Sequence, residues 1–131
     1  MRNDVLARSW ITLVGISLVA VGLLGFISNP IVGQPDALFP TGNLHNVVHL
    51  VTGLLALFVA FGLKGEAQIN GVIGYGVLYG VVFVACIVSP TLFGLFDTPV
   101  NVADHLLHAG VALISIALGL LARSSAMPQP A

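Results

Sequence analysis

Charged side chains are scarce in this 131-residue chain: Asp, Glu, Lys and Arg together make up 7% of it, against about a quarter in soluble domains. The hydrophobic share is 57%, and the mean hydropathy is +1.05. This composition excludes an ordinary soluble domain and predicts an integral membrane protein embedded in the lipid bilayer. The net charge of −1 and the lack of a basic cluster exclude a nucleic-acid-binding surface.

Several kinds of catalytic site are also absent from the sequence. A single cysteine, Cys86, excludes an intramolecular disulfide. There is no phosphate-binding glycine loop, no nucleophile elbow and no His-Glu-x-x-His motif. We therefore predict no catalytic residues, no recognised cofactor-binding motif and no enzymatic activity. Metal-assisted hydrolysis or redox chemistry at the membrane surface is a further alternative, which requires a bound metal.

Four long apolar runs dominate what the sequence does contain. Each approaches the roughly 20 residues that cross a hydrocarbon core as a helix. The predicted spans cover residues 10–27, 44–63, 69–88 and 102–122, within a single domain, 1–131, that ends in a mobile polar tail, 124–131. The predicted fold is an all-α integral membrane protein with four transmembrane helices in a bundle.

The four cations predict how the chain is oriented. Arg2 and Arg8 precede the first span, Lys64 lies between the second and third, and Arg123 follows the fourth, whereas the two longer loops contain no Lys or Arg. By the positive-inside rule, both termini face the cytoplasm and the longer loops face outward. The sequence thus predicts a multi-pass protein of the inner (plasma) membrane.

All four histidines lie at the starts of two related apolar runs. A displacement of 59 positions places His49 on His108, Asn46 on His105 and His45 on Asp104. This repeat predicts two hairpins of like topology, related by a pseudo-two-fold axis along the membrane normal. The second and fourth helices would then bring their polar first turns to the same outer depth.

Imidazole and carboxylate groups on facing helix turns are a common ligand set for transition metals. Histidines four residues apart share a helix face. The candidate metal ligands are His45, His49, Asp104 and His108, and the supporting polar residues are Asn43, Asn46, Asn101 and His105. Haem held between His49 and His108 is a less favoured alternative, and proton or ligand handling is another. The sequence thus predicts an outward-facing His/Asp cluster that binds a transition metal or another cofactor.

A purely structural interpretation fits the same residues. Asn101 and Asp104, like Asn43 and Asn46, have the three-residue spacing of a helix capping box. The cluster would then be a hydrogen-bonded helix clasp in a non-catalytic accessory subunit. The glycine-rich helix faces would pack against a second copy of the chain or a larger membrane complex.

The two motifs carry a family resemblance. The segment Leu44-His45-Asn46-Val47-Val48-His49-Leu50, followed by Gly53, and the later Asn101-Val102-Ala103-Asp104 with His108 resemble the two signature segments of an uncharacterised bacterial membrane-protein family, domain of unknown function 4383. The resemblance covers nearly the whole chain and implies fold and location, not activity. The family pattern has Asn at the position of His105, which makes that histidine the weakest candidate ligand.

Overall fold

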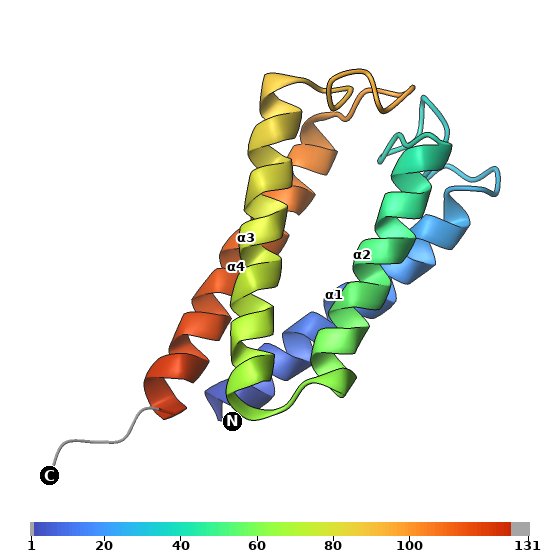
Figure 1. Ribbon diagram of the computed structural model, residues 1–131. Coiled ribbons are helices and arrows are strands. Elements are labelled where there is room, and N and C mark those ends of the chain that lie inside the picture. The colour runs from blue at the N-terminus through green and yellow to red at the C-terminus, as the bar shows by residue number, and fades with distance from the viewer. Residues whose placement is uncertain (1, 127–131) are drawn as a thin grey trace, which may run out of the picture.

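Four helices make up the described part of the chain, residues 2–126 of a computed structural model (Figure 1). They are α1 (Asn3–Leu24), α2 (Asn43–Gly62), α3 (Gly65–Val88) and α4 (Val102–Ala126). All four are long and apolar enough to cross a membrane. The predicted all-α, four-helix fold is confirmed.

The helices extend beyond the apolar runs at several ends. α1 begins at Asn3 rather than at residue 10, but it ends at Leu24, short of the predicted residue 27. α4 continues to Ala126, so residues 124–126 of the predicted mobile tail are helical, and residues 127–131 lie outside the described residues. Hydropathy marks only the lipid-embedded part of a helix, whereas backbone hydrogen bonding continues into polar residues. At the end of α4, the Ser125 hydroxyl donates to Leu121 O at 3.0 Å and accepts a 2.7 Å hydrogen bond from Asn3 Nδ2.

The predicted hairpins form, because α1 packs most extensively on α2, and α3 on α4. Glycines let the backbones touch within each hairpin: a Cβ at Gly53 would lie 2.8 Å from Val19 N and 3.0 Å from Gly15 O, and one at Gly76 would lie 2.9 Å from Ala112 O. These glycines are therefore used inside the chain. Gly74 and Gly110, by contrast, have open space around them, so packing of a glycine-containing face against a second chain stays a prediction.

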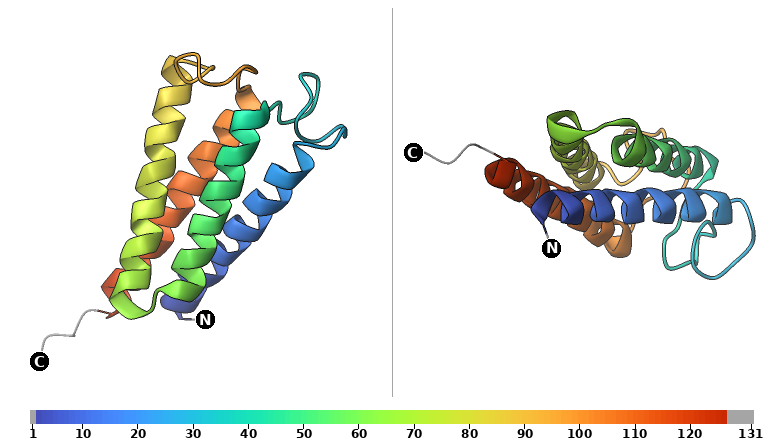
Figure 2. Two further views of the ribbon diagram at one scale, coloured as in Figure 1. Left: turned by 45° about the vertical axis from the view of Figure 1, so that its right-hand side comes forward. Right: turned by 90° about the horizontal axis from the view of Figure 1, so that it is seen from below.

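The two hairpins meet mainly where α1 crosses α4 (Figure 2). There Trp10 Nε1 donates a 2.8 Å hydrogen bond to Ser115 Oγ. α2 and α3 are joined by a short turn but contact each other little. They diverge toward the end of the bundle that carries the two long loops, which leaves room for the side chains between them (Figure 1).

Both long loops, residues 25–42 and 89–101, lie at one end of the bundle, which we call the loop end (Figure 1). The start of α1, the end of α4 and the α2–α3 turn lie at the other, the turn end. The loops contact each other: Asn101 Nδ2 donates to Leu38 O at 3.0 Å, and a Cβ at Gly42 would collide with the Asp97 carboxylate. Together they cover the helix turns that carry the histidines.

Candidate metal site

Three histidines from two helices converge at the loop end. His45 and His49 occupy the first two turns of α2, and His108 the second turn of α4. One nitrogen from each lies within 4.8 Å of those of the other two. α2 and α4 are not in close backbone contact, so long side chains reaching across the bundle create this group. The two halves of the repeat therefore meet through His49 and His108, as the sequence predicts.

The three imidazoles are buried in an aromatic enclosure. His45, His49 and His108 are only 2%, 3% and 3% exposed. The ring centroids of His45 and His49 are 4.4 Å apart, and those of His45 and His108 are 6.3 Å apart. Phe96 stacks on His45 at 4.4 Å with planes 6° apart, and Tyr79 lies 5.9 Å from His108. The cluster is enclosed, whereas the sequence suggested an outward-facing group.

Most of these ring nitrogens lack a hydrogen-bond partner. Both nitrogens of His49, and Nδ1 of His45 and of His108, are buried without one. Leaving a buried polar atom unpaired costs about 1–3 kcal/mol, and native proteins satisfy most such atoms. Converging imidazoles with unpaired nitrogens are what a site for an electrophile, above all a metal ion, requires.

Asp104 does not join the three histidines but forms hydrogen bonds at the start of α4. The Asn101 backbone N–H donates to Asp104 Oδ2 at 3.1 Å, and the Asp104 backbone N–H donates to Asn101 Oδ1 at 3.0 Å. This reciprocal pair is the capping box that their spacing predicts. Asp104 is 1% exposed and one turn from His108, but the group of converging ligand atoms does not include it.

The corresponding residues at the start of α2 do not form a capping box. Gly42 is the N-cap, with no side-chain hydrogen bond, and Asn43 is exposed. Asn46 is buried, and its Oδ1 accepts a hydrogen bond from Thr41 Oγ1. A Cβ at Gly25 would collide with the Asn46 amide, so the end of α1 packs directly on it. The two copies of the motif therefore share a sequence pattern but not their hydrogen bonds.

His105 lies outside the converging group. Its ring approaches Phe83 edge-on at 6.3 Å, and its Nδ1 is buried without a hydrogen-bond partner. This position agrees with the inference from the family resemblance that His105 is the weakest candidate ligand.

The comparison with protein families identifies the chain. The family model Domain of unknown function (DUF4383) matches residues 8–121. The chain belongs to this family. The DUF4383 match includes parts of all four helices, both long loops and every residue of the histidine cluster. No curated protein and no solved structure matches the chain. The DUF4383 description states no activity, so the functional argument rests on the site itself.

Three residues around the site were not predicted from sequence in this DUF4383 member: Thr41, Tyr79 and Phe96. Thr41 and Phe96 are loop residues without periodicity, and only the folding of the loops brings them to Asn46 and His45. Tyr79 and Tyr75 lie one turn apart on α3 and share the face that contacts α2. Both hydroxyls bind Thr52 of α2, Tyr75 by donating to Thr52 O and Tyr79 through Thr52 Oγ1, each at 2.9 Å.

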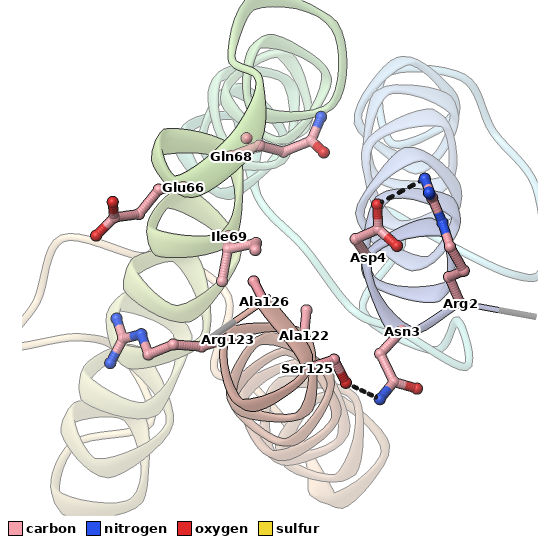
Figure 3. Close-up of a pocket in the computed structure, with 11 residues that line it drawn as sticks. Arg2, Asn3, Asp4, Glu66, Gln68, Ile69, Ala122, Arg123, Ser125 and Ala126 are labelled. Atoms are coloured by element: carbon pink, nitrogen blue, oxygen red, sulfur yellow. Dashed lines mark hydrogen bonds and ion pairs between the residues drawn. The ribbon is translucent and has the colours of Figure 1, made fainter. Parts of the chain in front are cut away.

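A pocket of about 830 Å³ lies at the turn end of the bundle, away from the histidines (Figure 3). Charged groups of both signs line it, and the described contacts engage several of them. Arg2 forms an ion pair with Asp4 at 3.0 Å, and Arg123 donates to Asn70 Oδ1 at 2.6 Å. Such mixed, paired charges do not favour a ligand of either sign, so this pocket is not a candidate site.

Proposed function

We propose that this protein binds a transition-metal ion through His45, His49 and His108 at the loop end of the bundle. The observation that carries the proposal is the convergence of three buried imidazoles, each of which has at least one buried ring nitrogen without a hydrogen-bond partner. Three imidazoles are a ligand set that zinc and several other first-row metals accept, with a further position open for water or another ligand. The proposal is for binding, not catalysis.

The spacing of the nitrogens suits a site that tightens when the ion enters. Ligand nitrogens at 2.0–2.1 Å from a tetrahedral ion lie about 3.3 Å apart, against the limit of 4.8 Å found here. Rotation of the imidazole side chains over roughly an ångström closes this difference. Phe96, stacked on His45, limits that movement and supports the ring from the loop side.

The two alternatives that the sequence left open, a hydrogen-bonded clasp and haem binding, have less support. A hydrogen-bonded clasp requires partners for the imidazole nitrogens, and those of His49 have none. Haem requires a large cavity beside its axial ligands. The cavity that His49 lines is about 210 Å³, below the roughly 300 Å³ at the small end of organic-ligand pockets.

We propose that the loop end, which contains the buried site, lies on the outer side of the plasma membrane. All four Lys and Arg residues belong to the turn end or the helix turns next to it, away from the histidines. Arg8, for example, donates through Nε to Ala60 O near the end of α2 at 3.0 Å. The positive-inside rule then favours a cytoplasmic turn end and an outward loop end.

The test is metal content on protein purified in mild detergent without a histidine tag. Samples are loaded with Zn²⁺ or Co²⁺, freed of excess metal and analysed for bound ion. We expect about one equivalent in the wild-type protein and in His105→Ala, and none in the His49→Ala/His108→Ala double variant. His105→Ala is the matched control, because it removes a neighbouring histidine outside the converging group.

The cobalt-loaded protein provides a second measurement. Intense visible absorption bands are expected from four-coordinate Co²⁺ in the wild-type protein and in the control. Failure of the wild-type protein to retain either ion, or equal retention by the double variant, would overturn the proposal.

A further inference from the structure

The second long loop, residues 89–101, covers the histidine cluster with two consecutive side chains. Phe96 stacks on the His45 ring, with centroids 4.4 Å apart and planes 6° apart. Asp97, the next residue, packs on the N-cap of α2, where a Cβ at Gly42 would lie 2.7 Å from Asp97 Cγ. Because the three imidazoles are at most 3% exposed, an ion reaches them only if part of this enclosure moves.

The second long loop is built as one unit on a narrow base. The Val100 N–H donates to Pro90 O at 2.9 Å, which joins the two ends of the loop. Within the loop, the Phe96 N–H donates to Thr91 O at 2.8 Å, and the Gly94 N–H donates to Thr91 Oγ1 at 3.2 Å. A compact loop whose ends lie together turns about its base without breaking such internal bonds. This construction suits a lid that moves as one piece while the helices stay packed.

Two residues of the loop hold a strained backbone. Leu92 and Phe93 have φ of +50° and +58°, in the left-handed region that residues other than glycine rarely adopt. Strain of this kind persists only where surrounding contacts impose it, and it is common in segments that switch conformation. Phe93 is 71% exposed, so its own side chain does not hold it there. Movement of the loop releases this strain, which lowers the free energy needed to open it.

We propose that the second long loop is the gate of the metal site and that Phe96 is the residue that shuts it. In the closed state Phe96 is 4% exposed and packs in one cluster with Cys86 of α3 as well as on His45. In the open state the loop has turned about its base, Phe96 has left the His45 ring and Asp97 has left Gly42. The inference rests on the proposed function, because it describes how a metal ion enters and leaves that site.

A gate changes the rate of metal exchange in both directions and leaves the affinity nearly unchanged. Phe96→Ala favours the open state of the empty and the loaded protein alike. Zinc release to excess chromophoric chelator and cobalt uptake in stopped flow should each become about tenfold faster, as loss of one buried aromatic contact supplies. The dissociation constant should change by less than about threefold. Leu95→Ala, in the same loop at a side chain that is 62% exposed, is the matched control and should exchange metal at the wild-type rate.

A reversible covalent bridge should hold the gate shut. The Cβ position at Gly42 and the Asp97 side chain are close enough for a disulfide between cysteines introduced there. In a Cys86→Ala background, oxidised Gly42→Cys/Asp97→Cys should exchange zinc at least about tenfold more slowly than the same variant reduced and methylated on both sulfurs. The methylated sample is the matched control, because it has the same substitutions without the bridge.

Chemical labelling of His45 measures the gate without a metal. Diethyl pyrocarbonate modifies histidines that it can reach, and mass spectrometry of metal-free protein gives the rate at this residue. Phe96→Ala should raise the labelling rate about tenfold, and the oxidised bridge should lower it, while Leu95→Ala should leave it unchanged. If the bridge does not form, Phe96→Ala and its control decide the question.

The outcomes separate this inference from the metal proposal. Zinc retention with exchange and labelling rates that respond neither to Phe96→Ala nor to the bridge would overturn the gate and leave the metal site. A weaker affinity in Phe96→Ala with an unchanged rate of uptake would also overturn the gate, because Phe96 would then only support the ligands. Labelling of His45 that responds as expected in a protein that retains no metal would overturn the metal site and leave the gate.

Discussion

Replacing Asp104 by Asn separates a helix cap from a metal ligand. The Asp104 carboxylate accepts the Asn101 backbone N–H at 3.1 Å, and an Asn amide oxygen at the same place can accept it equally. The reverse hydrogen bond, from the Asp104 backbone N–H to Asn101 Oδ1 at 3.0 Å, does not involve the substituted atoms. Asp104→Asn therefore keeps the capping box and removes only the negative charge.

The expected loss of stability follows from these contacts. A carboxylate in the first turn of a helix contributes about 0.3–1 kcal/mol through the helix dipole, so Asp104→Asn should lower the free energy of unfolding by that amount. Asp104→Ala also removes the acceptor for a buried N–H and should cost about 1–2 kcal/mol in total. Because the converging ligand group does not include Asp104, the metal affinity of Asp104→Asn should fall by less than about tenfold.

Two assays on the same detergent-purified samples measure these effects. Unfolding in mixed micelles with increasing dodecyl sulfate, followed by far-UV circular dichroism, gives the free energy of unfolding. Competition with a chromophoric chelator gives the zinc affinity. The reasoning would be refuted by a hundredfold or greater loss of zinc affinity in Asp104→Asn with stability nearly unchanged, because Asp104 would then be a ligand.

Other substitutions test the packing of the bundle by the same unfolding assay. Gly53→Ala should destabilise the protein by about 1–3 kcal/mol, because its Cβ would meet the α1 backbone, whereas Gly74→Ala, with open space around it, should be neutral or stabilise by up to about 1 kcal/mol. Equal effects of the two would contradict the close α1–α2 crossing. Trp10→Phe and Ser115→Ala should each lower the free energy of unfolding by about 0.5–1.5 kcal/mol, because each removes the same hydrogen bond. The double variant should lose little more than either single variant. If the two losses add in full, the hydrogen bond contributes nothing to stability. Gly33→Ala should cost about 1–3 kcal/mol, because φ is +106° there, and an unchanged stability would mean that this loop is not held in its observed conformation.

Much of the candidate site was predictable because local spacing determines it. His45 and His49 are four residues apart, so any helix places them on one face. The Asn101–Asp104 capping box depends on atoms three residues apart and forms as its spacing predicts. The same spacing at Asn43 and Asn46 fails, because Thr41 and the close approach of Gly25 draw Asn46 into other contacts.

The enclosure of the site was not predictable in the same way. Phe96 reaches His45 only through the path of the second long loop, and that loop has no periodic pattern to read. The cavity at His49 depends on how α1, α4 and the first long loop pack, which is a matter of side-chain volumes across the bundle. Trp10 of α1 donates a hydrogen bond to Ser115 of α4, a contact between residues that are far apart in the sequence.

The sequence by itself determined the four helices, their pairing as repeated hairpins and the presence of histidines at one end. These follow from long apolar runs, from scarce charge and from a repeated motif, all of which act along the chain or between its neighbours. Only the tertiary structure decided which polar atoms remain without partners. Three imidazoles converge, and Asp104 bonds within its own helix, because of how distant helices and two loops pack together. The spacing of residues along the chain does not determine that packing.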